Sequence, residues 1–345
     1  MNEHGGYFGK KQNEIFDFSV NINPLGVPTK LIEELAKELP NLIRYPEIDG
    51  ITAKETLSKH LKKEIDQIIL GNGATELIYL FARAIKANKV LIIHPTFTEY
   101  ERAFEVSGSK VYDFYTSEKD GFRINMEDLF DSIEQIEPDV VVLCNPNNPT
   151  GIFYKPEELA PLLKVIQKKN SCLFIDESFI DFTDQPSLSN FIEDYSIFIL
   201  RSMTKTYGIP GLRLGYGLGS TDIINKLNCI KEPWTINTLA LKAVGILLED
   251  EEYFCEMKEW YEKEKEFLFN ELSNINNIEV FPSEGNFFLC KLKNRTGWDL
   301  KDTLVNEGIY IRTCTDFKGL NDQFIRLAVR SREENEKLLD ALKQN

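Results

Sequence analysis

The sequence predicts an α/β fold with a large domain around a mostly parallel sheet and a smaller α+β domain. Short apolar runs without polar alternation are separated by stretches of helical periodicity, which is typical of parallel sheets covered by helices on both faces. The C-terminal third instead places a long charged helical stretch before several short strand-like runs. A chain of 345 residues is long enough for two domains.

The expected strands of the large domain are short and apolar. They lie at residues 68–70, 90–93, 111–115, 140–143, 172–175, 197–200 and 213–218. Helical periodicity appears between them at residues 74–85, 156–169 and 221–228. Alternating strands and helices of this length predict a parallel sheet.

The small domain follows a different pattern. Residues 237–274 are helical throughout, and the charged run EDEEYFCEMKEWYEKEKEF indicates a long solvated helix. Strands are expected at residues 278–281, 286–291, 310–312 and 324–328, and a closing helix at 332–343. We expect residues 1–44 to form an N-terminal arm and part of the small domain, residues 45–260 the large domain, and residues 261–345 the small C-terminal domain.

Charge and composition exclude several classes of partner. The net charge is −15, with acidic residues spread along the chain, which disfavours nucleic acid and anionic membranes as partners. The six cysteines form no C-x-x-C pair, and the three histidines have no metal-ligand spacing. The N-terminus MNEHGGYFGKK lacks an apolar signal region. We therefore expect a cytoplasmic enzyme with reduced cysteines and no metal.

Lys205 lies in the most informative segment, RSMTKTYGIPGLRLGYG, directly after an expected strand. A lysine that attacks a carbonyl must be kept largely unprotonated, and burial or a cationic neighbour such as Arg213 promotes this. Ser202, Thr204 and Arg213 suit a phosphate group. A lysine, an aldehyde and a phosphate together describe pyridoxal 5'-phosphate (PLP) held as a Schiff base. Alone, the motif also fits a surface lysine after a strand.

Four further turns follow expected strands, at the sheet edge where open α/β sheets bind ligands. In GNGATE, the backbone at Gly73, Ala74 and Thr75 can cradle a phosphate at a helix N-terminus, although a plain glycine turn fits equally well. Phe97 in HPTFTEY offers an aromatic face for a pyridine ring, or packs in the core.

The other two turns are CNPNNPTG and DESFIDF. Asn148 in the first can offer its amide to the phenolic oxygen of the cofactor. Asp176, at the start of the second, follows four apolar residues. There it can pair with a pyridinium nitrogen and keep the ring an electron sink, or it can cap a helix.

The order Asn148, Asp176, Lys205, Arg213 resembles the fold-type I PLP enzymes, specifically the aminotransferase class I and II group. This resemblance implies PLP as the cofactor and Lys205 as its catalytic lysine. It also implies that Tyr45 of the RYPE motif reaches the cofactor phosphate of a neighbouring subunit, in a homodimer with shared active sites.

The termini sharpen the resemblance. HGG, DFSVNINPLGVP, RYPE, PWTINTLA and IRTCTDFKGLNDQFIRLAVRSREENEKLLDAL resemble the L-threonine-O-3-phosphate decarboxylase family, which is related to histidinol-phosphate aminotransferase. This implies α-decarboxylation of a small anionic amino acid phosphate for cobalamin biosynthesis. The implied substrate-binding residues are His4, Gly5, Asn21, Asn148, Arg312 and Arg326.

Phe179 stands three residues after Asp176, where aminotransferases of this group usually have tyrosine. Losing that phenol removes a hydrogen bond to the cofactor and should alter its proton affinity. O-phospho-L-threonine is the expected substrate, with O-phospho-L-serine as an alternative. The alternative function is that of an aminotransferase, acting on histidinol phosphate or on another substrate of this group. A non-catalytic PLP-binding protein and a dinucleotide-dependent enzyme fit less well, since no DNA-binding segment and no G-x-G-x-x-G are present.

Overall fold

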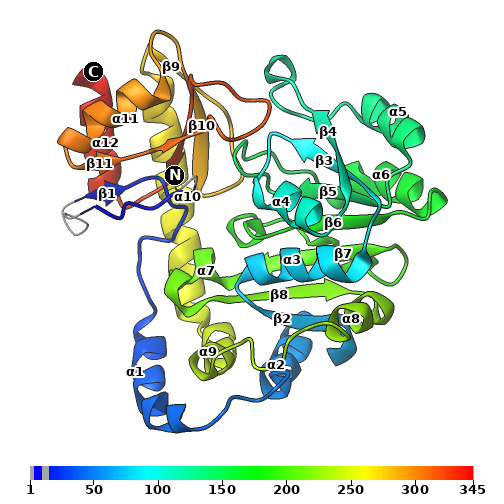
Figure 1. Cartoon of the computed structure of the whole chain (residues 1–345). Coiled ribbons are helices and arrows are strands. Elements are labelled where there is room, and N and C mark those ends of the chain that lie inside the picture. Colours follow the sequence, from blue (N-terminus) through cyan, green and yellow to red (C-terminus); the bar gives the residue numbers. More distant parts are fainter. Residues whose placement is uncertain (1–3, 10–14, 345) are drawn as a thin grey trace.

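The computed structural model describes residues 4–9 and 15–344. The remaining parts of the expected N-terminal arm, residues 1–3 and 10–14, lie outside the described residues. The α/β fold class is confirmed. A seven-stranded sheet has the order β2-β8-β7-β6-β5-β3-β4, and a four-stranded sheet has the order β12-β13-β10-β9 (Figure 1).

The large sheet is parallel except at one strand. Its strands are β2 (Ile68–Asn72), β3 (Lys89–His94), β4 (Lys110–Tyr115), β5 (Val140–Cys144), β6 (Cys172–Asp176), β7 (Ile197–Ser202) and β8 (Leu214–Gly219). Only β8 runs antiparallel to both of its neighbours, β2 and β7. The strands β2, β3, β5, β6 and β7 therefore all end at the same edge, which brings five of the sequence motifs together.

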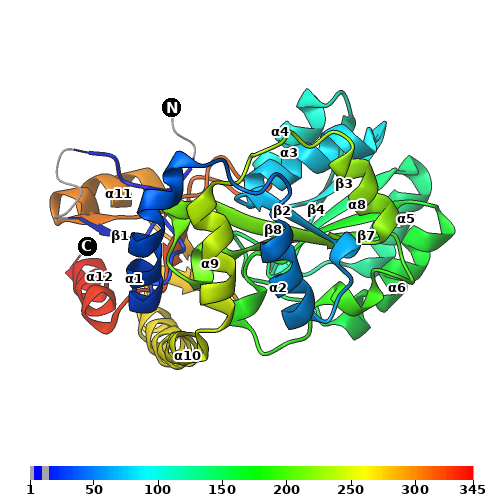
Figure 2. The ribbon, with the colours of Figure 1, turned by 90° about the horizontal axis from the view of Figure 1, so that it is seen from below.

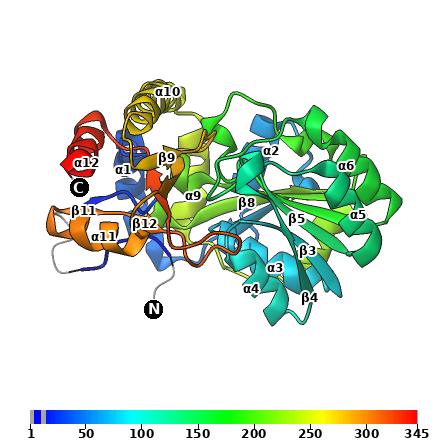
Figure 3. The ribbon, with the colours of Figure 1, turned by 90° about the horizontal axis from the view of Figure 1, so that it is seen from above.

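Helices cover both faces of this sheet (Figures 2 and 3). One apolar layer lies under α3 (Ala74–Ile85), α4 (Glu99–Val106) and α8 (Thr221–Asn228). The opposite layer lies under α2 (Ile51–Leu61), α5 (Met126–Ile136), α6 (Pro156–Lys168) and α9 (Thr238–Leu248). In β5, Val140 and Val142 enter the first layer while Val141 and Leu143 enter the second. This alternation explains why the strand is apolar throughout.

The smaller sheet contains β9 (Ile278–Val280), β10 (Phe287–Leu292), β12 (Arg312–Thr313) and β13 (Phe324–Ala328). Around it lie α10 (Glu251–Ser273), α11 (Gly297–Asn306) and α12 (Arg332–Gln344). The strand expected at residues 310–312 is instead two short strands in different sheets. Here β11 (Ile309–Tyr310) pairs with the N-terminal β1 (Phe16–Asp17), whereas β12 pairs with β13.

The helical stretch from residue 237 to 274 is divided by Asp250, whose side chain accepts a hydrogen bond from the backbone of Tyr253 and begins α10. Helix α10 is continuous across residue 260, and the three-part division of the chain stays a prediction. The remaining helices are α1 (Thr29–Glu38) and the short α7 (Met203–Thr206). Short 3₁₀ turns occur at Leu39–Ile43, Ile65–Gln67, Glu118–Asp120, Ile180–Phe182, Leu188–Phe191 and Pro210–Leu212. Among the described residues, none of the helices has the length and apolarity needed to cross a bilayer.

Candidate active site

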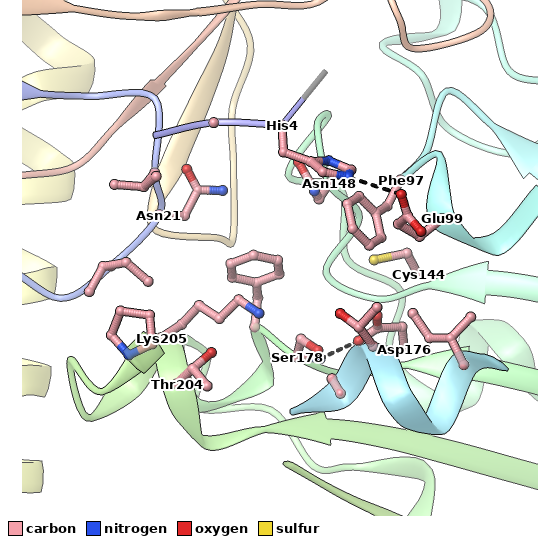
Figure 4. Close-up of a pocket in the computed structure, with 18 of the residues that line it drawn as sticks. His4, Asn21, Phe97, Glu99, Cys144, Asn148, Asp176, Ser178, Thr204 and Lys205 are labelled. Atoms are coloured by element: carbon pink, nitrogen blue, oxygen red, sulfur yellow. Dashed lines mark hydrogen bonds and ion pairs between the residues drawn. The ribbon is translucent and has the colours of Figure 1, made fainter. Parts of the chain in front are cut away.

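A cavity of about 530 Å³ lies at the carboxyl edge of the large sheet. Most of the site residues predicted from the sequence line this cavity (Figure 4). Those lining it are His4, Gly5, Asn21, Ala74, Thr75, Phe97, Asn148, Asp176, Thr204, Lys205, Arg213, Arg312 and Arg326. Gly73 and Ser202 lie directly behind this lining, and each contacts one of its members.

Lys205 enters the cavity from α7, the short helix that follows β7. Its Nζ donates a hydrogen bond to Ser202 Oγ at 3.2 Å, and Ser202 Oγ lies 2.8 Å from Thr204 Oγ1. Burial lowers the pKa of Lys205 below its ordinary value, and the nearby charge of Arg213 lowers it further while Asp176 opposes the shift. The site therefore makes the neutral amine easier to reach than it is for a lysine in water.

Asp176 ends β6 on the opposite side of the cavity from Lys205 (Figure 4). Its Oδ1 accepts a hydrogen bond from the backbone of Ser178 at 2.7 Å, and its Oδ2 accepts one from Tyr100 Oη at 2.6 Å. Burial raises the pKa of Tyr100, and the charge of Asp176 contributes, so the phenol remains a donor. The carboxylate is thus held in one orientation, which the sequence alone did not reveal.

Gly73 and Arg213 lie together at the start of α3. Gly73 has φ 76°, a conformation that glycine adopts without strain, and a Cβ there would lie 2.3 Å from Arg213 Nη2, so a larger residue would be strained and would displace the guanidinium. The first residues of α3, Ala74 and Thr75, line the cavity next to this guanidinium. A helix N-terminus beside an arginine is a suitable place for a phosphate.

Arg326 comes from β13 of the small sheet and is 6% exposed. Its guanidinium donates to Asn148 Oδ1 at 2.5 Å and to the Ser19 carbonyl at 2.7 Å. Both acceptors are neutral, and within the described part of the chain Nε has no partner. Burial lowers the pKa of Arg326 to about 10, which leaves it charged near neutral pH. A buried charge without a carboxylate partner is a strong candidate for binding an anion.

Arg312 differs from Arg326 because its charge is already balanced. Its Nη2 lies 2.5 Å from Asp316 Oδ2, and its Nη1 donates to the Thr313 carbonyl at 2.6 Å. The other carboxylate oxygen, Asp316 Oδ1, is buried without a partner in the described residues. Arg312 therefore offers an anion less free charge than Arg326 does.

The N-terminal segment lies across the mouth of the cavity. Gly5 packs so closely that a Cβ would lie 2.3 Å from the Ser19 carbonyl oxygen. Gly6 donates its backbone N–H to Ser19 Oγ at 2.8 Å. Nearby, Asn21 is 6% exposed, and its Oδ1 has no hydrogen-bond partner among the described residues. His4 extends from this segment to the far wall (Figure 4).

Two aromatic rings shape the middle of the cavity. Phe97 lies 5.6 Å from Tyr100 and 5.7 Å from His4, measured between ring centroids. Phe179 is 5% exposed and packs edge-on against Phe287 at 5.0 Å. The Nζ of Lys205 lies 5.7 Å from the centroid of the Phe179 ring. Position 179, which is usually tyrosine in aminotransferases of this group, therefore lies in the cavity near the Lys205 amine.

Tyr45 does not reach this cavity in its own chain. It is 84% exposed and lies 5.2 Å from Trp234 between ring centroids. It lines a separate groove with residues of α2 and α9. Exposed apolar side chains surround this region, among them Leu39, Leu42, Ile43, Ile48 and Ile51.

Sequence reasoning missed several residues of the wall, among them Glu99, Tyr100 and Cys144. The first two stand beside Phe97 in HPTFTEY, and their position at a strand–helix turn was the available signal. Burial raises the pKa of the Cys144 thiol to about 12, so it stays neutral and takes no part as a nucleophile.

A seven-stranded α/β sheet with a lysine, an aspartate and an asparagine at its carboxyl edge defines the fold-type I class of the PLP-dependent enzymes. The chain belongs to the aminotransferase class I and II family, whose model matches residues 13–342.

Three similar proteins refine this placement. The threonine-phosphate decarboxylase of Salmonella typhimurium is 35% identical over 99% of this chain and 95% of its own length. The adenosylcobalamin biosynthesis bifunctional protein of Leptospira interrogans is 35% identical over 98% of this chain and 40% of its own length. The crystal structure of the histidinol-phosphate aminotransferase from Clostridium acetobutylicum is 37% identical, with a TM-score of 0.89, covering 95% of this chain and 98% of that one.

Proposed function

We propose that this protein is a PLP-dependent decarboxylase that converts O-phospho-L-threonine to an amino-alcohol phosphate for cobalamin biosynthesis. The observation that carries the proposal is one cavity lined by both Lys205 and Arg326, in which the hydrogen bonds of the Arg326 guanidinium to the described residues go to neutral acceptors. The full-length similarity to threonine-phosphate decarboxylase supports the choice of reaction. The cobalamin context is supported by the name of the Leptospira relative.

The residues at the sheet edge fit PLP. Lys205 Nζ would hold its aldehyde carbon, and Asp176 would pair with the ring nitrogen because Tyr100 and Ser178 already orient that carboxylate. Phe97 would cover the ring and Asn148 would donate to its phenolic oxygen. The phosphate would lie at Gly73, Ala74, Thr75, Ser202, Thr204 and Arg213.

Bound PLP supplies an electron sink for the pair released when the bond from Cα to the carboxylate breaks. The protein selects the bond by orientation, since only the bond perpendicular to the ring plane is activated. We assign the substrate carboxylate to Arg326, because its charge acts on Lys205 and it is hydrogen-bonded to Asn148. Once displaced and protonated, the Lys205 ammonium would deliver a proton to Cα, directly or through a water molecule, and take a replacement proton from solvent.

The substrate phosphate would be bound at the other end of the cavity by His4, Gly5, Asn21 and Arg312. Anchoring a non-reacting group there uses its binding energy to align the reacting bond. The Asn21 side-chain oxygen has no hydrogen-bond partner among the described residues, and its amide nitrogen would donate to the phosphate. O-phospho-L-serine lacks only a methyl group, which in an apolar pocket is worth about 1–3 kcal/mol.

The functional unit would be a homodimer. Tyr45 lies far from its own cavity on an exposed apolar surface, and such patches mark protein interfaces. In the dimer, Tyr45 of each chain would contact the cofactor phosphate bound by the partner.

Product identification tests the proposed reaction. The purified holoenzyme is incubated with O-phospho-L-threonine, and separately with histidinol phosphate plus 2-oxoglutarate. We expect carbon dioxide and an amino-alcohol phosphate from the first mixture. The 37% identity to histidinol-phosphate aminotransferase favours the second candidate function. Turnover that requires the keto acid and releases no carbon dioxide would establish that candidate instead.

A further inference from the structure

Glu99 is a carboxylate in the wall of a cavity for which we propose an anionic substrate. It is the first residue of α4, and its side chain is 9% exposed. A buried carboxylate next to a dianion is unfavourable unless cations neutralise it. Its partners therefore determine its effect on ligand binding.

Three side chains engage this carboxylate. Glu99 Oε1 lies 2.9 Å from His4 Nε2, and 3.7 Å from Nη1 of Arg102 one turn further along α4. Glu99 Oε2 accepts a hydrogen bond from Tyr79 Oη at 2.6 Å. Burial, together with Glu99, raises the pKa of Tyr79 to about 12, so this phenol stays a donor and fixes the orientation of the carboxylate.

The contact with His4 bridges the mouth of the cavity (Figure 4). On one side, the segment is anchored by hydrogen bonds from the backbone of Gly6 to Ser19 Oγ and from the backbone of Tyr7 to Asp17 Oδ2. On the other side, His4 reaches Glu99 in the large sheet's layer of helices. Glu99 thus helps to position the imidazole, although the two residues are 95 positions apart in the sequence.

We propose that Glu99 is a positioning residue for the substrate phosphate, holding His4 and Arg102 at the cavity mouth as an anion-recognition pair. This inference rests on the proposed function. Glu99 orients the His4 imidazole through Nε2, and the Arg102 guanidinium beside the same carboxylate brings a positive charge to the cavity. The Arg102 side chain is 70% exposed, and its ion pair with Glu99 at 3.7 Å favours the conformations in which the guanidinium lies beside the cavity. Glu99 itself does not contact the reacting atoms.

The test compares Glu99→Gln with Glu105→Gln, a change to an exposed glutamate of the same helix. The probe is propyl phosphate, which has no amine and cannot react, and its dissociation constant for the holoenzyme is measured by calorimetry. We expect Glu99→Gln to weaken this binding about tenfold, the size of one lost charge-assisted contact. Binding of butyrate, a carboxylate without phosphate, should not change.

Steady-state kinetics with O-phospho-L-threonine give a second readout. Glu99→Gln should raise KM about tenfold and change kcat less than about twofold, because the lost contact is remote from the reacting bond. Tyr79→Phe, which removes only the hydrogen bond to Oε2, should weaken propyl phosphate binding about threefold. Melting temperature and cofactor absorbance should match the wild type in both variants.

Unchanged or tighter binding of propyl phosphate in Glu99→Gln would overturn this inference, as would a fall in kcat with KM unaltered. The proposed reaction fails separately. If the wild type releases no carbon dioxide from O-phospho-L-threonine while Glu99→Gln still weakens propyl phosphate binding, Glu99 keeps its role and the substrate must be another phosphate monoester.

Discussion

The two walls of the cavity are built in different ways. The proposed cofactor wall, with Asp176, Lys205 and Arg213, comes from neighbouring strand ends of one sheet. The proposed substrate wall, with His4 and Arg326, comes from the N-terminal segment and the small sheet, where the hydrogen bond between Ser19 and Arg326 joins residues 307 positions apart. The order of strands in one sheet therefore places the residues of the first wall, whereas the second wall depends on contacts between residues far apart in the sequence.

Asn148 joins the two walls. It lies on the turn after β5, yet its Oδ1 accepts a hydrogen bond from Arg326 on β13. Changes to the cofactor wall should remove the chemistry itself, whereas changes to the substrate wall should mainly alter substrate affinity. This contrast can be tested by substitutions of decreasing expected effect.

The largest effect is expected for Lys205→Ala. Without this amine the protein should lose the visible absorbance band of its bound cofactor, and activity should fall by about 10⁴-fold or more. Lys263→Ala, on the exposed side of α10, is the matched control. A Lys205→Ala enzyme that keeps both the band and the activity would contradict the assignment of the whole cofactor wall.

The same lysine gives a pH prediction. Only the neutral amine can attack the aldehyde, so the rate of PLP uptake by cofactor-free protein should rise with pH and then level off. Because burial lowers the pKa of Lys205, the midpoint should lie below the ordinary value of 10.5. Stopped-flow absorbance measures the rate, and a midpoint at or above that value would show that the amine is exposed to water.

Asp176→Asn should have the next largest effect. The variant keeps the shape of the side chain but removes the charge, so we expect kcat to fall about 10²- to 10³-fold. Tyr100→Phe, which removes only the hydrogen bond to Oδ2, should cost about tenfold or less. If Tyr100→Phe is the more damaging change, the phenol rather than the carboxylate acts on the cofactor.

Arg326→Lys probes the substrate wall. A lysine keeps the charge but cannot bond Asn148 and the Ser19 carbonyl in a fork, so KM for O-phospho-L-threonine should rise about 10- to 100-fold. Arg330→Lys is the control, since Arg330 is paired with Glu334 on α12. If kcat falls by a larger factor than KM rises, Arg326 takes part in the reaction itself and not mainly in substrate binding.

The sequence predicted which residues line the cavity better than it predicted the contacts between them, for a physical reason. Motifs such as RSMTK follow strands that must be buried, so strand order alone brings their ends to one edge. The contacts of Glu99 with His4, and of Arg312 with Asp316, depend on side-chain orientation across the cavity. No periodicity encodes these pairings. The division of residues 310–312 between two sheets was missed because each strand has only two residues.

The smallest effect is expected for Phe179→Tyr, which tests whether the reaction type is decided in the cofactor wall at all. The ring packs edge-on against Phe287 and lines the cavity 5.7 Å from the Lys205 amine, so an added hydroxyl would be within the proposed cofactor region. We expect kcat for decarboxylation to fall between about twofold and tenfold, the value of one neutral hydrogen bond. Carbon dioxide release and keto-acid-dependent amino transfer are measured side by side. Since Arg326 and the phosphate anchor still align the same bond, decarboxylation should remain the main reaction, and a switch to amino transfer would place the choice of reaction at position 179.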